Sequence, residues 1–183
     1  MADMGSLDLE MKSGRHYRLR SAKPKDAASI LKHSRKVMMN TDFLLTTAEE
    51  MNYVPLKKEK EWIKSILYHP NKLAIIAEID EGIIGFLDFH GGHQLRTVHQ
   101  GEFGMSVDEN FRGEGIGRSL VSTMIDWATA HPILEKINLE VFHNNIPAIH
   151  LYKSIGFEEE GRRKKQVKIE DEYFDLISMA KFL

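Results

Sequence analysis

Residues suited to binding an anion gather in one short segment, Arg112-Gly113-Glu114-Gly115-Ile116-Gly117-Arg118. Before it, alternating apolar residues predict a strand ending at Val107; after it, apolar residues at helical spacing predict a helix to about Ala130. A helix N-terminus presents unpaired N–H groups and the positive end of the peptide dipoles, and glycine lets a ligand approach the backbone closely. The segment therefore predicts a phosphate-binding turn between a strand and a helix.

Spacing distinguishes three kinds of phosphate-binding turn. A Walker A loop has a Lys and then a Ser or Thr after its last glycine, whereas Gly117 is followed by Arg118. The dinucleotide fingerprint G-x-G-x-x-G would need a third glycine where Arg118 stands. The third pattern, Arg-x-x-Gly-x-Gly, is matched in full by Arg112, Gly115 and Gly117. A plain glycine turn that begins a helix would give a similar string, so the rest of the chain must decide between them.

Composition narrows the class of protein. A chain of 183 residues suits one compact domain, and its net charge of -2 argues against broad nucleic-acid binding. The absence of cysteine excludes disulfides, thiolate nucleophiles and cysteine metal ligands. No apolar run reaches the length of a membrane span and no signal-peptide pattern opens the chain, so we expect a cytoplasmic enzyme. Residues 1–14 are polar and aperiodic, and we expect a flexible arm before a single domain at 15–183.

The periodicity of apolar residues predicts an α+β fold with one central βαβα stretch. Residues 40–55 suit a loop or short helices, 91–100 a polar loop, and 161–172 the connection of a closing antiparallel pair. The expected strands are 17–20, 73–79, 83–89, 103–107, 137–141, 157–162 and 174–179, and the expected helices are 21–38, 56–68, 118–130 and 144–155.

A second motif lies one predicted helix beyond the glycine turn. A strand is followed by Asn145, Ala148, Leu151 and Tyr152 in the pattern Asn-x-x-Ala-x-x-Leu-Tyr, and then by Gly156-Phe157. With Arg-x-x-Gly-x-Gly in the correct order before it, the chain resembles the GNAT superfamily of acetyl-CoA-dependent N-acetyltransferases, as a small bacterial-type member. The resemblance covers nearly the whole of residues 17–183. It implies a mixed, mostly antiparallel sheet of six to seven strands flanked by about four helices, with the βαβα stretch as the acetyl-CoA-binding core.

The resemblance also implies where acetyl-CoA would bind. The pyrophosphate would lie over the glycine turn, and the backbone at the end of the preceding strand would pair with the pantetheine arm like an added strand. Asn145 has two readings of about equal weight, as a helix N-cap or as a pantetheine contact. Arg118 could bind phosphate or be a solvated surface residue. The cofactor-binding residues expected are Met105, Ser106, Val107, Arg112, Gly113, Glu114, Gly115, Ile116, Gly117, Arg118 and Asn145.

Two residues are candidates for the chemistry, which would be direct attack of a neutral amine on the thioester in a ternary complex. The resemblance places the Tyr152 hydroxyl near the cofactor sulfur, where it could protonate the departing thiolate; an aromatic residue at this spacing could instead be packed core. Glu102 is the candidate general base, because an amine is mostly protonated near neutral pH. It could equally be an exposed carboxylate that points away from the site.

The acceptor is left open between a small amine and a protein or peptide amine. Its pocket is expected from residues 40–55, 91–100 and 162–173, which carry no decisive motif. A non-catalytic acyl-CoA-binding or sensor module on the same fold is the alternative function. His90, His93 and His99 are read as loop histidines and not as a metal site, so no metal is expected. A homodimer is expected only because the resemblance to the family implies one.

Overall fold

The computed structural model describes residues 4–183. They form eight strands, five α-helices and two 3-10 turns. In chain order these are β1 (Ser6–Glu10), β2 (His16–Ser21), η1 (Pro24–Asp26), α1 (Ala27–Met39), α2 (Ala48–Asn52), α3 (Leu56–Leu67), β3 (Lys72–Ile79), β4 (Gly82–Gly91), β5 (Gln100–Val107), η2 (Glu109–Phe111), α4 (Ile116–Thr129), β6 (Lys136–Phe142), α5 (Ile146–Ser154), β7 (Glu158–Ile169) and β8 (Glu172–Phe182).

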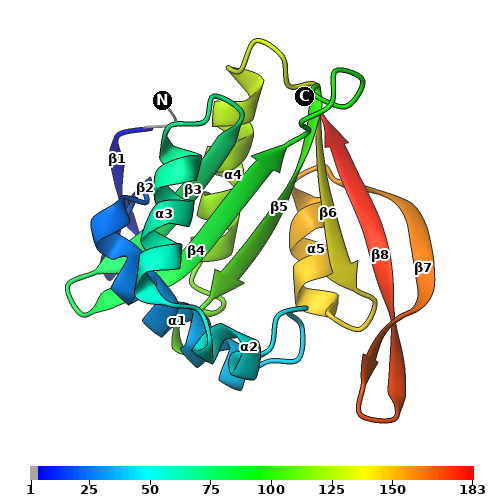
Figure 1. Ribbon diagram of the computed structural model, residues 1–183, viewed down its shortest axis with the longest axis horizontal. Coiled ribbons are helices and arrows are strands. Elements are labelled where there is room, and N and C mark those ends of the chain that lie inside the picture. Colours follow the sequence, from blue (N-terminus) through cyan, green and yellow to red (C-terminus); the bar gives the residue numbers. More distant parts are fainter. Residues whose placement is uncertain (1–3) are drawn as a thin grey trace.

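All eight strands belong to one sheet, in the order β1-β2-β3-β4-β5-β6-β8-β7 (Figure 1). Every neighbouring pair is antiparallel except β5 and β6, which run parallel. The mixed, mostly antiparallel sheet is therefore confirmed, whereas the expected six to seven strands and about four helices are too few. The extra strand is β1, and the extra helix is the short α2, whose start is fixed by a capping box between Thr47 and Glu50.

Helices cover both faces of the sheet. Along β3, Leu73, Ile75 and Ala77 belong to the core shared with α4, while Ala74 and Ile76 belong to the core shared with α1 and α3. A strand that is buried on both faces reads as a continuous apolar run, and β3 does so from Leu73 to Ala77. Consecutive residues of β3 thus pack against different helices, and each face of the sheet has its own core.

The parallel contact between β5 and β6 is short. Only Gln100, Gly101 and Glu102 of β5 pair with β6, opposite Lys136 to Asn138. The Asn138 amide fastens this contact, because its Nδ2 lies 3.2 Å from the Gly101 carbonyl oxygen and 3.0 Å from the Gln100 Oε1. Beyond Glu102 the two strands diverge, as Figure 1 shows. From residue 103 to 107, β5 therefore pairs only with β4 among the described strands.

The prediction of a flexible arm at residues 1–14 is wrong for its central part. Ser6–Glu10 forms β1, which pairs along its whole length with β2, and Met11 is buried. Leu7 and Leu9 alternate with polar residues, a period-two pattern that fits an edge strand, and Leu9 packs against the main core. Residues 1–3 of the predicted arm lie outside the described residues.

The connection predicted at residues 161–172 is also wrong over most of its length. β7 continues through the charged run to Ile169 and turns at Glu170-Asp171 into β8. Figure 1 shows this two-stranded ribbon extending beyond the rest of the sheet. The Asp175 carboxylate accepts hydrogen bonds from the Arg162 Nε and the Lys165 backbone N, both at 2.7 Å. Pairing with β8 therefore keeps a strongly charged segment extended despite its low strand propensity.

Candidate active site

The glycine turn has the backbone conformation that its sequence requires. Gly113 and Gly115 have φ values of +83° and +95°, in the left-handed region that favours glycine. Gly115 is the N-cap of α4, and the first helical hydrogen bond runs from the Ser119 N–H to the Gly115 carbonyl at 3.0 Å. The N–H groups of residues 116–118 therefore have no acceptor within the helix and are available to an anion.

Gly117 brings three predicted site elements together. A Cβ at this position would lie 3.3 Å from the Leu151 Cδ2 and 3.4 Å from the Met105 Cε. The start of α4 thus lies against both the end of β5 and α5, and a larger residue would push these elements apart. Met105 and the Asn145–Tyr152 helix, which the sequence placed in one site, are neighbours for this reason.

Side chains around the turn have structural contacts of their own. The Glu114 carboxylate accepts a hydrogen bond from the Ser13 backbone N at 2.9 Å, and its carbonyl accepts one from the Lys12 N at 3.3 Å. The Arg118 Nη2 donates to the Ser154 Oγ at 2.7 Å and so links α4 to α5. Arg112 is exposed at the rim of the turn. The Glu114 and Arg118 side chains therefore tie the turn to the loop before β2 and to α5.

The remaining cofactor candidates lie beside the divergence of β5 and β6. Residues 105–107 belong to the part of β5 that has left β6. The Ser106 hydroxyl lies 3.0 Å from the His33 Nε2 of α1; burial lowers the pKa of this histidine and favours its neutral form. The Asn145 Oδ1 accepts a hydrogen bond from the Ala148 N at 3.4 Å, which is the N-cap geometry for α5. The amide nitrogen of Asn145 is the end left to contact a ligand.

Tyr152 is buried where β5 leaves β6. Its ring packs edge-on against Phe103, with centroids 5.8 Å apart, and against Phe157 at 5.9 Å. Phe103 is the first residue of β5 beyond the contact with β6. Burial raises the pKa of Tyr152 to about 12, so its hydroxyl stays protonated at neutral pH and can donate a hydrogen bond. The ring of Tyr152 is therefore packed in the core.

Glu102 and Phe103 lie on opposite faces of β5, and Glu102 does not line the cavity on its own face of the sheet. Residues alternate between faces along a strand, so Glu102 shares its face with Gly104 and Ser106. The residue is exposed, although partial burial of its carboxyl and then the neighbouring Glu140 carboxylate raise its pKa. It lies directly opposite His90 of β4.

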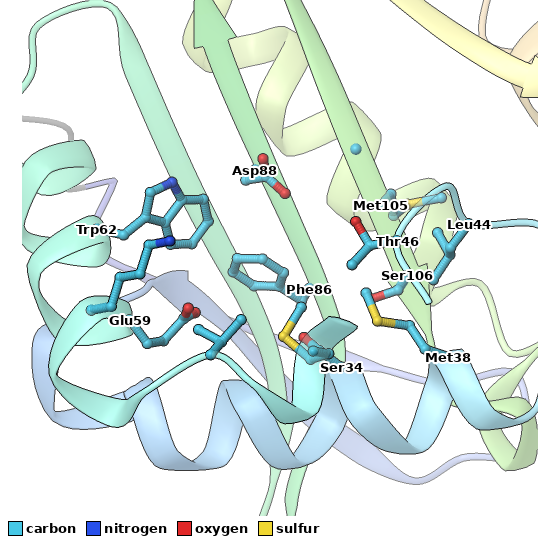
Figure 2. A pocket seen from close by; sticks show the side chains of 14 residues that line it. Ser34, Met38, Leu44, Thr46, Glu59, Trp62, Phe86, Asp88, Met105 and Ser106 are labelled. Carbon is cyan, nitrogen blue, oxygen red and sulfur yellow. The ribbon is translucent and has the colours of Figure 1, made fainter. Parts of the chain in front are cut away.

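A cavity of about 380 Å³ opens on the face of the sheet that α1 and α3 cover. Figure 2 shows Glu59 and Trp62 reaching into it from α3, with Phe86 and Asp88 on β4. Four of its lining residues, Leu44, Thr46, Met51 and Val54, come from 40–55, and none comes from 91–100 or 162–173, the other two segments expected at the acceptor pocket. The cavity is lined by Ser34, Met38, Leu44, Thr46, Met51, Val54, Lys58, Glu59, Trp62, Phe86, Asp88, Gly104, Met105 and Ser106.

Two carboxylates, Glu59 and Asp88, lie in this mostly apolar cavity. The Asp88 Oδ2 is 2.9 Å from the His90 Nε2. Burial, and then the nearby Asp88 charge, raise the pKa of Glu59. Sequence reasoning missed both residues; for Asp88 the available signal was a single carboxylate within the apolar run from Ile83 to Phe89.

Two kinds of feature are absent from residues 4–183. No group of three or more histidines and acidic residues is placed to hold a metal ion. No helix in this part of the chain is both long and apolar enough to cross a membrane.

Comparison with known proteins identifies the family. The family model described as "Acetyltransferase (GNAT) family" matches residues 40–157. The chain belongs to this family. An L-amino acid N-acetyltransferase of Escherichia coli is 32% identical over 128 residues, which cover 70% of this chain and 79% of the relative.

Solved structures agree with the GNAT assignment. A GNAT-family acetyltransferase from Streptococcus pneumoniae superposes with a TM-score of 0.88 at 26% identity, over 91% of this chain and 99% of that one. A putative acetyltransferase from Salmonella typhimurium, solved with its cofactor acetyl-CoA, has the same fold, with a TM-score of 0.79 at 19% identity over 90% and 92% of the two chains. The GNAT fold expected from the sequence is confirmed. The protein is an N-acetyltransferase that transfers the acetyl group of acetyl-CoA to an amine.

Proposed function

We propose that this GNAT enzyme acetylates the primary amine of a small molecule bound in the cavity, by direct attack on acetyl-CoA in a ternary complex. The observation that carries the proposal is that the cavity and the unpaired part of β5 share residues 104–106. An acceptor in the cavity would therefore meet a thioester carried along β5. The modest volume of about 380 Å³ favours a small acceptor over a folded protein surface.

The cofactor would be held mainly by backbone groups. The pyrophosphate would accept hydrogen bonds from the N–H groups of residues 116–118, with Gly113 and Gly115 shaping the turn. The pantetheine arm would pair with Met105, Ser106 and Val107 on the side that β6 has left, and the Asn145 amide nitrogen would reach it from α5. Acetyl-CoA supplies the activated acetyl group, and this chain's residues orient it.

The acceptor must lose a proton before or as it attacks. We assign that proton to the Asp88 carboxylate rather than to Glu102, because Asp88 lines the cavity and Glu102 does not. His90 is hydrogen-bonded to Asp88 and lies opposite Glu102 in the strand register, so it is a neighbour of both carboxylates. The proton would pass outward along this row to the solvent, with Glu102 as its outer carrier.

The neutral amine nitrogen then bonds to the thioester carbonyl carbon, and the C–S bond breaks as the carbonyl reforms. The Tyr152 hydroxyl would stabilise the departing thiolate by a hydrogen bond and give it a proton. Because burial raises the pKa of Tyr152 to about 12, its hydroxyl is protonated at neutral pH and can donate to the thiolate. The N–C bond formed and the C–S bond broken leave an acetamide and free CoA.

The test is amine-dependent release of free thiol from acetyl-CoA across a panel of small primary amines, with calorimetric binding of acetyl-CoA measured in parallel. We expect binding of acetyl-CoA and turnover with some of the amines. Tight binding without amine-dependent thiol release would instead support the acyl-CoA-binding or sensor module. Failure to bind acetyl-CoA would contradict both functions.

A further inference from the structure

We infer that the acceptor is a cationic amine without a carboxylate near its reacting nitrogen, so that the cavity discriminates against free amino acids. This inference rests on the proposed function and concerns the chemical class of its acceptor. It departs from the activity named for the Escherichia coli relative, whose acceptors are L-amino acids.

The charge inside the cavity carries the inference. Glu59 and Asp88 come from different elements, α3 and β4, yet approach closely enough for the charge of one to affect the other. Asp88 is paired only with His90 among the ion pairs of residues 4–183, and Glu59 has no such pair within that range. Two carboxylates that repel each other in a half-buried space are stabilised by an entering ammonium group and opposed by an entering carboxylate.

The aromatic residues of the cavity suit the same ligand. Trp62 lies between Phe86 and His90, with ring centroids 6.2 Å and 6.0 Å away. Tryptophan faces attract ammonium groups, and the apolar lining would accept the alkyl or aryl part of an amine. Lys58 is the one lysine or arginine among the lining residues, and it is exposed on the first turn of α3, so the cavity offers an acceptor carboxylate a single, solvent-screened cation.

Matched acceptors isolate the carboxylate. The enzyme would be assayed for thiol release with L-leucine and L-phenylalanine, and with their decarboxylated counterparts 3-methylbutylamine and 2-phenylethylamine. Each pair differs only in the α-carboxylate. We expect kcat/KM to favour the amine by at least about 10-fold in every pair that is turned over. An equal or greater kcat/KM for the amino acids would overturn the inference and leave acetyl transfer itself intact.

A charge-removing variant tests whether the cavity causes the preference. Glu59→Gln should reduce the amine-to-amino-acid ratio at least several-fold, because one of the two repelling carboxylates is gone. The matched control is Glu61→Gln on the same helix, where the residue is exposed and lies outside the cavity lining, and the ratio should not change. An unchanged ratio in Glu59→Gln would overturn the inference. Thiol release with neither set of acceptors would overturn the proposed function, and the inference with it.

Discussion

Tyr152 is the residue whose substitution should separate chemistry from cofactor binding. Tyr152→Phe keeps the ring that packs on Phe103 and Phe157 and removes only the hydroxyl. We expect kcat to fall by about 100-fold, a typical loss for a general acid, with the Kd of acetyl-CoA changed less than about twofold. Steady-state thiol release and calorimetry measure the two quantities.

Tyr17→Phe is the control for Tyr152→Phe. Tyr17 is also buried, and its hydroxyl donates to the Ser119 Oγ at 2.8 Å. Loss of this hydrogen bond should lower the free energy of unfolding by about 1 kcal/mol and leave kcat unchanged. A normal kcat with weaker acetyl-CoA binding in Tyr152→Phe would mean that the hydroxyl has a packing role.

Gly115 is fixed by backbone conformation and not by lack of space. A Cβ there would meet nothing within 4 Å, yet φ is +95°. Gly115→Ala should therefore lower the unfolding free energy by about 1–2 kcal/mol and weaken acetyl-CoA binding, as the turn relaxes and moves its N–H groups. Gly161→Ala is the matched control, since that position is equally open but outside the left-handed region. Urea denaturation and calorimetry of both variants test this, and equal effects would refute it.

The conformation of the glycine turn could be predicted at the residue scale, but the pair of carboxylates in the cavity could not. The turn is a local feature, because its glycines and the helix that follows are contiguous in the sequence. Glu59 and Asp88 are brought together by α3 folding across β4, and no spacing in the chain encodes that proximity. For the same reason the sequence suggests Glu102 as the general base and gives no reason to consider Asp88, which lines the cavity.

At the scale of elements, one arginine joins three of them. Arg20 of β2 makes a two-pronged hydrogen-bonded ion pair with Asp26 of η1, at 2.7 and 3.0 Å, and pairs with Glu78 of β3 at 2.7 Å. Its side chain is only 18% exposed, and that of Asp26 only 10%. Removing the Arg20 guanidinium would leave the Asp26 and Glu78 carboxylates without a neutralising positive charge.

Arg20→Leu should therefore lower the unfolding free energy by about 3 kcal/mol at pH 7, measured by urea denaturation. Burial acts to raise the pKa of Asp26, but the Arg20 hydrogen bonds outweigh it and the pKa lies below its usual value. The stabilisation from Asp26 is thus present above about pH 4 and is lost as the pH falls through the lowered pKa, so the difference between Arg20→Leu and the parent should shrink there. Arg18→Leu is the control, because its ion pair with Asp8 is exposed and screened by solvent and its loss should lower stability far less. Equal losses in both variants would contradict this account.

Elements with strong periodicity could be predicted, and those held mainly by a neighbour could not. α3 and α4 carry apolar stripes and begin and end within two residues of their predicted bounds. β1 has only two apolar residues and depends on β2 for its hydrogen bonds. The outer half of β7 has a charged sequence that favours a loop, and its strand form comes from β8.

At the scale of the whole molecule, the sheet consists of two parts, β1–β5 and β6–β8, joined by three residue pairs. A ligand that lies between them would connect both parts. At acetyl-CoA concentrations of 100 times Kd, mass action adds about 2.7 kcal/mol, which should raise Tm by roughly 5–10 °C in a thermal-shift assay. Pantetheine, which lacks the pyrophosphate, should give a smaller shift at the same concentration. Equal shifts would argue against the glycine turn as the main binding element.

The hydrogen bonds from Lys12 and Ser13 to Glu114 have a practical consequence for handling the protein. The loop between β1 and β2 supports one side of the glycine turn, although about a hundred residues separate them in the sequence. Shortening the chain to begin at the core strand β2 would leave the fold's centre intact but remove that support. Affinity for acetyl-CoA would then depend on where the recombinant chain starts. A tag fused close to β1 would alter that affinity by disturbing the loop that supports the glycine turn.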